Sequence, residues 1–211
     1  MSNILQVRTR YDRRRAVRYA LSRYNDPNPK FANMDTMGGG GDCTNFTSQC
    51  LLVGGLKMDF RQTGQETEWW YRYVTREPFD RNNDDWWSCT WSLPETQLRY
   101  LAANHGQTLD LLENPVLAKR LSLGDIIYYD WYGEDRFGHS AIVTAFNRYR
   151  VPYVTYRTLS PLRPRRNVHW RLTHRRRDAV RIWAIHLDNQ PVAYEQPPDW
   201  SKLVPCDQSR K

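Results

Sequence analysis

Residues 38–51 constrain this chain more than any other stretch, because a flexible segment passes there directly into a patterned helix. Four consecutive glycines are followed by Asp42 and Cys43. Glycine adopts backbone angles that other residues avoid, so the run suits a loop that passes close to a substrate. Asp42 is a favourable N-cap for a helix that starts at Cys43, and Gly54 and Gly55 are favourable stop signals. The sequence therefore predicts a loop followed by a helix from Cys43 to about residue 53.

Cys43 is the first residue on the predicted buried face of this helix. That face contains residues at helical spacing, namely Cys43, Phe46, Thr47, Cys50 and Leu51. Unpaired N–H groups and the helix dipole stabilise negative charge at a helix N-terminus, and an anionic sulfur is the nucleophilic form of cysteine. Cys43 is therefore the candidate nucleophile. The alternative is a buried structural cysteine, which fits Cys50 better.

The length of the chain limits its domain organisation, and its net charge limits the kinds of partner it can bind. A chain of 211 residues can bury a substantial core as one domain, placed here at residues 1–190, with a C-terminal tail at 191–211. The net charge of +8 favours acidic partners such as nucleic acid, anionic cell-wall polymers or a membrane surface. The arginine-rich runs at 13–15, 163–166 and 175–177 are interpreted as solvated faces. A nucleic-acid-binding protein is a weaker hypothesis, since the runs are scattered and no recognised nucleic-acid motif accompanies them.

Compartment signals are sparse. The four cysteines show neither paired metal-binding spacing nor the density of a disulfide-stapled secreted domain. No stretch approaches the roughly 20 apolar residues of a membrane span. The first ten residues lack the apolar core of a signal peptide. We therefore expect a cytoplasmic protein or a processed cell-wall-associated fragment, and the oligomeric state stays open.

The order of the predicted elements indicates an α+β fold. Residues 11–24 have the spacing of an amphipathic helix, and helical spacing returns over residues 92–120. Strands rich in β-branched and aromatic residues are predicted at 124–131, 139–146, 152–158 and 181–187. Helices first and antiparallel strands afterwards are typical of α+β domains. The tryptophan-rich residues 56–92 are interpreted as a loop-rich insert that lines a surface cleft, with ordinary core packing as the alternative.

A nucleophilic cysteine needs a base, and His139 is the best candidate. It opens a predicted strand directly after Gly138, where a side chain can stand at the edge of a cleft. An imidazole within hydrogen-bond reach would take the thiol proton and later protonate the leaving amine. The other histidines lack convincing metal-ligand spacing with a third donor, so we expect no metal and no cofactor.

Several segments are similar to a known family. Residues 11–20, 28–29, 41–51 and 54–55 resemble the putative amidase domain family of papain-like cysteine hydrolases, which is related to CHAP-type amidases. Residues 124–129 and 138–144 resemble the strand before the catalytic base and the strand that carries it. The likeness covers roughly residues 11–187.

The resemblance implies a papain-like fold and hydrolysis of an amide bond through a thioester acyl-enzyme. Cys43 would be the nucleophile and His139 the base. Asp42 and Gly41 would support the oxyanion site together with the backbone N–H of Cys43. Members are bacterial, and relatives often cut peptides of the cell wall, so a peptide or a peptidoglycan-derived amide is the expected substrate, with no nucleic acid as partner.

The third catalytic residue, which would orient the imidazole, departs from the family pattern. Where the family tends to carry a histidine followed by threonine, this chain has Arg157 and Thr158. An arginine cannot accept a hydrogen bond from the imidazole. Thr155 lies on the same strand face and is the nearest neutral substitute, with Asp130 as the alternative. We predict a weak or absent orienter and low or substrate-assisted activity, or else a degenerate member that acts as a cell-wall or protein binding module.

Overall fold

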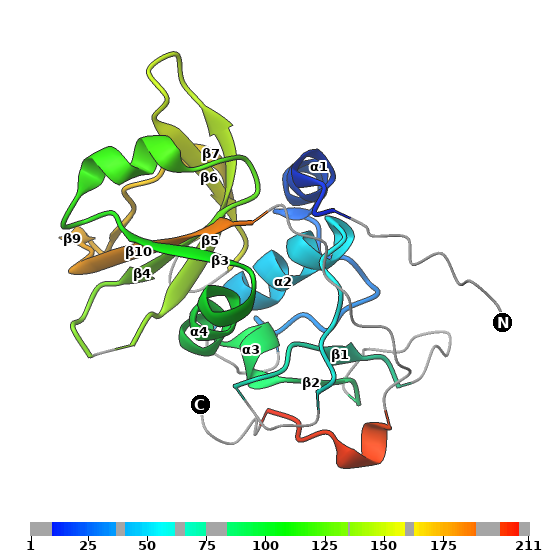
Figure 1. The fold of residues 1–211 in the computed structure, drawn as a ribbon. Helices are drawn as coiled ribbons and strands as arrows, with labels where there is room; N and C mark the ends of the chain where they lie inside the picture. Colours follow the sequence, from blue (N-terminus) through cyan, green and yellow to red (C-terminus); the bar gives the residue numbers. More distant parts are fainter. Residues whose placement is uncertain are drawn as a thin grey trace, which may run out of the picture.

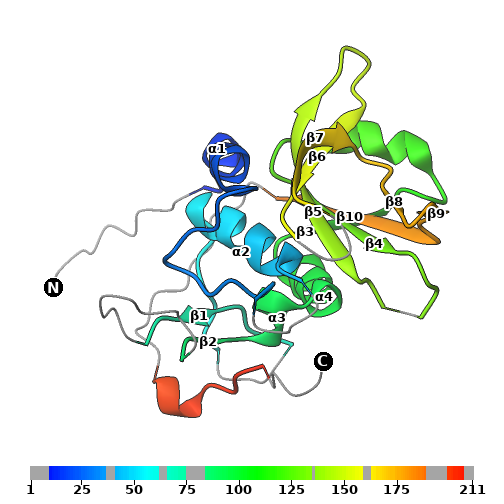
Figure 2. The ribbon, with the colours of Figure 1, turned by 180° about the vertical axis from the view of Figure 1, so that it is seen from behind.

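The computed structural model describes residues 10–36, 41–61, 66–74, 84–134, 136–158, 163–188 and 199–206. One antiparallel sheet of six strands carries helices on one face, and a smaller two-stranded sheet lies beyond them (Figures 1 and 2). The predicted α+β class is confirmed.

The large sheet has the strand order β3-β10-β4-β5-β6-β7, and every neighbouring pair is antiparallel. Its strands are β3 (Gly106–Asp110), β4 (Ile126–Asp130), β5 (His139–Phe146), β6 (Pro152–Tyr156), β7 (Arg165–His169) and β10 (Arg181–Leu187). The predictions for β4, β5, β6 and β10 are confirmed. The prediction of helix throughout residues 92–120 is wrong at β3, which pairs with β10 at the sheet edge.

The α-helices gather on one side of the sheet. They are α1 (Arg13–Arg23), α2 (Cys43–Val53), α3 (Cys89–Ser92) and α4 (Pro94–Asn104), and the short 3-10 helices are η1 (Pro115–Arg120) and η2 (Trp200–Lys202). The small two-stranded sheets are β1 (Tyr71–Arg72) with β2 (Trp86–Trp87), and β8 (Thr173–His174) with β9 (Arg177–Asp178). In both ribbon views α2 lies between the large sheet and the β1–β2 pair (Figures 1 and 2). The predicted helices at residues 11–24 and at Cys43 are confirmed.

The large sheet separates two hydrophobic cores. Successive side chains of a strand point to opposite faces, so Tyr128 and Ile142 pack with the helices in one core. Tyr129 and Ala141 pack in the other core, on the face away from α2. This alternation decides which side chains of β5 can reach the start of α2.

The tryptophans of residues 56–92 are mainly core residues, and the interpretation of this segment as the lining of a surface cleft is wrong for them. Trp69, Trp70 and Trp91 are fully buried, and the rings of Trp69 and Trp91 stack with centroids 4.9 Å apart. Trp86 is the exception, since it is 43% exposed. Large aromatic rings gain more from burial than from exposure, which explains the placement.

A disulfide between Cys89 and Cys206 ties the C-terminal segment to the start of α3. The backbone N–H of Cys206 donates to the carbonyl of Trp87, and Leu203 is buried. Sequence spacing did not indicate this bond, because its two cysteines are 117 residues apart. The described part of the predicted tail thus packs on the domain, beside β2.

The arginine run at residues 13–15 is a solvated face only in part. Arg14 and Arg15 are exposed. Arg13 instead reaches across to the sheet, where it donates to the carbonyl of Leu123 and forms an ion pair with Asp125. One arginine of this run therefore joins α1 to the sheet.

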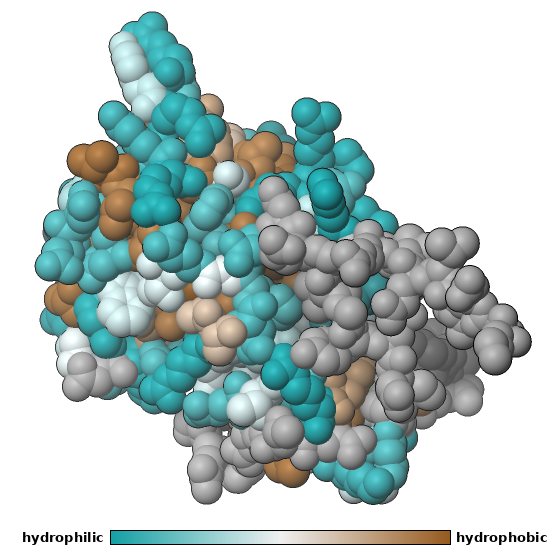
Figure 3. Space-filling model, in the orientation of Figure 1, coloured by the Kyte–Doolittle hydropathy of each residue, from teal (hydrophilic) through white to brown (hydrophobic). Residues whose placement is uncertain are grey.

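The surface seen in Figure 3 is mostly hydrophilic, and apolar residues show on it in small separate patches. The projection at the top is the connection between β5 and β6. None of the helices in the described ranges has the length and apolar character that a membrane crossing requires.

Candidate active site

Cys43 is the first residue of α2 and faces the large sheet. Gly41 reaches a φ of 135°, a backbone angle that favours glycine, just before the chain enters the helix. The Cys43 sulfur lies 3.7 Å from the hydroxyl of Thr44, and Thr44 in turn lies 3.2 Å from the hydroxyl of Ser140 on β5. The described start of the helix thus holds a thiol against one strand of the sheet, and the glycines at 38–40 lie outside the described residues.

The sulfur sits where the pairing of β5 with β6 stops. The first paired residues of this ladder are Ile142 and Thr155. Continuing the same register by two residues would set Ser140 opposite Arg157. The backbone N–H and the hydroxyl of Ser140 instead lie close enough to the Cys43 sulfur to lower the pKa of its thiol. Because β6 does not cover this end of β5, the thiol has access to a backbone donor of the sheet.

Burial dominates the ionisation of the thiol. It raises the pKa of Cys43 above the ordinary cysteine value, and the nearby carboxylate of Asp42 raises it further. Hydrogen bonds from Ser140 and Thr44 stabilise the thiolate and lower the pKa in part. The net direction is upward, so the resting form at neutral pH is the protonated thiol.

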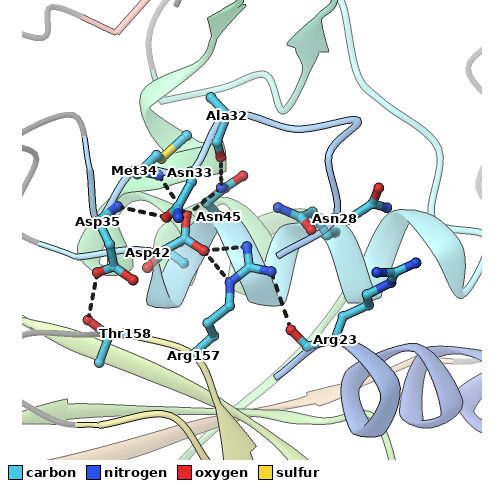
Figure 4. Close-up of polar contacts among 12 residues, drawn as sticks. Arg23, Asn28, Ala32, Asn33, Met34, Asp35, Asp42, Asn45, Arg157 and Thr158 are labelled. Atoms are coloured by element: carbon cyan, nitrogen blue, oxygen red, sulfur yellow. Dashed lines mark hydrogen bonds and ion pairs between the residues drawn. The ribbon is translucent and has the colours of Figure 1, made fainter. Parts of the chain in front are cut away.

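Asp42 occupies the predicted N-cap position without making the capping hydrogen bond. Its carboxylate accepts instead from the backbone N–H of Met34, from the amide of Asn45 and from the guanidinium of Arg157 (Figure 4). Burial raises the pKa of Asp42, and the positive charge of Arg157 opposes this shift. The prediction of Asp42 as an N-cap is therefore wrong in its chemistry, because a cation competes successfully for the carboxylate.

His139 opens β5 as predicted, but its ring lies on the face of the sheet away from α2. The imidazole packs edge-on against Tyr156 at 4.9 Å between ring centroids, and lies 5.8 Å from Tyr129 and 5.7 Å from Trp131. Its neighbour Ser140 contacts α2, and adjacent residues of a strand point to opposite faces. The structure therefore does not bring His139 and Cys43 together.

The surroundings of His139 keep its ring neutral. Its Nε2 atom is buried without a hydrogen-bond partner among the described residues. Burial lowers the pKa of His139 to about 3, and the nearby His174 adds to the shift. Such a group behaves as part of the core at neutral pH.

The residues expected to orient the imidazole also lie elsewhere. The Thr155 hydroxyl lies 2.7 Å from the hydroxyl of Thr144, and it accepts from the backbone N–H of Asn167. Thr155 shares the α2 face with Arg157, so it cannot serve a ring on the opposite face. Asp130, the alternative, pairs with Arg181 and accepts backbone N–H groups of the following turn.

Sequence reasoning missed Ser140 and Thr44 as partners of the sulfur. Both are fully buried hydroxyls, and Thr47 adds a third hydroxyl 3.3 Å from that of Ser140. The signal for Ser140 was present in the alternation of β5: only one of two adjacent residues can face the helix. Which of the two it is depends on the packing of α2, which the sequence does not specify.

A prediction follows from the buried imidazole of His139. Because its pKa in the folded state lies below the unfolded value, the unfolded chain binds a proton that the folded chain excludes, and stability is lost as pH falls from about 6.5 towards 3. Between about pH 6.5 and 4, we expect the free energy of unfolding of His139→Leu to fall by about 1–3 kcal/mol less than that of the unmodified chain. Urea unfolding at a series of pH values measures this difference.

His169→Leu is the matched control, because His169 is exposed on β7. It should leave the acid dependence of the unfolding free energy close to that of the unmodified chain. An equally steep acid loss in His139→Leu and in the unmodified chain would show that His139 is not held neutral in the core.

Comparison with known proteins shows which family the chain belongs to. Residues 10–184 match the family described as putative amidase domain. The chain belongs to this family. The protein is also 31% identical over 148 residues to the uncharacterized protein YhbB of Bacillus subtilis, in a match that spans 70% of this chain and 42% of that protein. No solved structure matched.

The family description supports amide hydrolysis as the general chemistry. The chain spans less than half the length of its Bacillus relative. In the described ranges, no group of three or more His, Cys, Asp or Glu side chains could hold a metal ion.

Proposed function

We propose that this chain is a cysteine amidase of low intrinsic activity, in which Cys43 attacks the carbonyl carbon of a peptide-like amide. The observation that carries the proposal is the placement of Cys43 at the first position of α2, where the Thr44 hydroxyl links its sulfur to the Ser140 hydroxyl of β5. Membership of the putative amidase family supports amide bonds as the target. Peptides of the bacterial cell wall are the substrate class we propose, on the resemblance to amidases that cut them.

The proposed reaction proceeds in two steps. The sulfur bonds to the carbonyl carbon, the carbon–nitrogen bond breaks, and the thiol proton leaves with the amine, which gives a thioester. Water then hydrolyses the thioester to a carboxylic acid and regenerates the thiol. Backbone N–H groups at the start of α2 are the candidate donors for the negative oxygen that develops in each step.

Proton removal limits the rate in this proposal. The imidazole of His139 lies beyond the sheet. Arg157, which pairs with Asp42 on the α2 face, is a guanidinium and cannot accept the proton in its place. The proton would therefore pass to solvent hydroxide or to a basic group of the substrate. General base catalysis typically contributes about 10²–10⁴-fold, so a rate lower by a factor of this size is expected.

The test compares Cys43→Ala with Cys50→Ala, because Cys50 is the other free cysteine on the same helix and is fully buried. Hydrolysis of peptidyl aminomethylcoumarin amides and of soluble peptidoglycan fragments is measured with each variant. Cys43→Ala should fall to the uncatalysed rate, whereas Cys50→Ala should retain most of the activity. Hydrolysis by Cys43→Ala at the rate of the unmodified chain would refute the assignment of Cys43 as the nucleophile.

A second candidate function is a family member that binds cell-wall or protein ligands without cleaving them. The placement of the His139 imidazole on the face of the sheet away from the thiol favours it. Sedimentation with purified cell walls separates the two functions. Retention of the unmodified chain and of Cys43→Ala on the walls, with no released fragments, would support binding over hydrolysis.

A further inference from the structure

Asp42 stands at a position where its carboxylate would ordinarily cap a helix. An aspartate at an N-cap usually accepts a hydrogen bond from the backbone N–H of the second or third residue of the helix. No such bond forms at the start of α2. The carboxylate is nevertheless fully buried, so other groups must supply its hydrogen-bond donors and balance its charge.

Those groups come from three separate segments (Figure 4). One carboxylate oxygen, Oδ1, accepts from the backbone N–H of Met34 at 3.0 Å and from Asn45 Nδ2 at 2.6 Å. The other, Oδ2, accepts from both Nε and Nη2 of Arg157. A two-donor contact of this kind fixes the orientation of the carboxylate and strengthens its interaction with the guanidinium.

Arg157 is itself held firmly. Its side chain is 3% exposed, and its guanidinium carbon lies 5.2 Å from the ring centroid of Phe46 on α2. Its Nη1 atom donates to the carbonyl of Arg23 at the end of α1. The guanidinium therefore connects the end of β6, the end of α1 and the residue that precedes Cys43.

We infer that Arg157 is a positioning residue for Cys43: it turns the Asp42 carboxylate away from the N-terminus of α2 and leaves the first N–H groups of that helix to the reacting sulfur and carbonyl. The inference rests on the proposed role of Cys43 as nucleophile. It gives Arg157, which cannot itself act as a base, the role of holding the Asp42 carboxylate.

Without Arg157, the negative charge of Asp42 would lie unopposed next to the negative charge of the Cys43 thiolate. A carboxylate released from Arg157 would be free to take the capping position, where it would occupy N–H groups that stabilise an anion. It would also oppose the formation of a thiolate on the adjacent residue. Asp42 already raises the pKa of Cys43 while it is paired, so an unpaired Asp42 should do so more strongly.

The test measures the rate of Cys43 alkylation by iodoacetamide against pH in four full-length chains, namely the unmodified chain, Arg157→Met, Asp42→Asn and Asp42→Asn with Arg157→Met. We expect Arg157→Met to react about tenfold more slowly at pH near 8, with its profile shifted to higher pH. The double variant should recover to the unmodified rate or above it, since it carries no carboxylate. Asp42→Asn alone should react faster than the unmodified chain.

The recovery separates positioning from mere support of the fold, because a purely structural role predicts the double variant to react no faster than Arg157→Met. Unchanged alkylation in Arg157→Met, or a loss that the double variant does not reverse, would overturn the inference. If Arg157→Met fails to fold, an unchanged profile in Asp42→Asn overturns it. Arg181→Met, which removes an ion pair with Asp130 at the end of β4, is the control and should leave the rate unaltered.

Alkylation needs no amide substrate, so the outcome is independent of the hydrolysis test. A chain that cleaves no amide could still show the expected alkylation pattern. In that case the proposed function would fail while the effect of Arg157 on the thiol stands.

Discussion

Arg13→Met is expected to lower the free energy of unfolding by about 2–4 kcal/mol, because it leaves a buried carboxylate without its cation. Arg13 Nη1 lies 2.5 Å from Asp125 Oδ1, and the Asp125 side chain is fully buried. The same guanidinium donates to the carbonyls of Leu123 and Leu187, so methionine would remove these two hydrogen bonds as well. The estimate lies below the full cost of breaking a buried pair because the Arg13 side chain is 16% exposed.

Arg14→Met provides the matched control for this measurement. Arg14 is the next residue of the same helix and is exposed, so its replacement should change stability by no more than about 0.5 kcal/mol. Equilibrium unfolding in urea gives both values. A loss of the same small size in the two variants would show that Arg13 does not join α1 to the sheet.

The arginine run illustrates a limit of sequence reasoning. Three consecutive arginines at the start of a helix indicate a solvated face, and this holds for Arg14 and Arg15. Arg13 lies on a different face of the helix and contacts the carboxylate of Asp125, 112 residues later in the chain. Composition cannot reveal such a partner, because it depends on where the sheet packs.

Elements with a strong local pattern were predictable. The bounds expected for β5 and β10 match the structure, since both are runs rich in apolar residues with β-branched side chains and clear turn signals. β3 was not, because Thr108 is its only β-branched residue and the strand is fixed by pairing with β10. The polar, arginine-rich β7 depends in the same way on its pairing with β6.

The position of the Cys43 thiol was predictable from the sequence, whereas the side chains that surround it were not. The glycine run, Asp42 and the spacing from Cys43 to Leu51 were enough to place the sulfur at a helix start. The orientation of His139 depends on which face of β5 meets α2, and a shift of one residue reverses it. The pairing of Asp42 with Arg157, and the packing of tryptophans in the core, likewise depend on contacts between distant segments.

The alkylation rate of Cys43 is expected to rise about tenfold for each pH unit from about pH 6 to 9. Burial raises the pKa of the Cys43 thiol, so the reactive thiolate is a small and growing fraction throughout this range. A thiol paired with an imidazole behaves differently, since the ion pair forms at lower pH and the rate levels off near or below neutrality. The two arrangements therefore predict rates at pH 6 that differ by a large factor.

This pH profile is the most direct test of Cys43 as a nucleophile without an imidazole partner. It is measured by mass spectrometry of the Cys43 peptide in the unmodified chain and in His139→Leu, with the Cys89–Cys206 disulfide left intact. A steady rise to about pH 9, the same in both chains above about pH 6.5, is the result expected for a nucleophile without an imidazole partner. A plateau at or below about pH 7 that disappears in His139→Leu would contradict it.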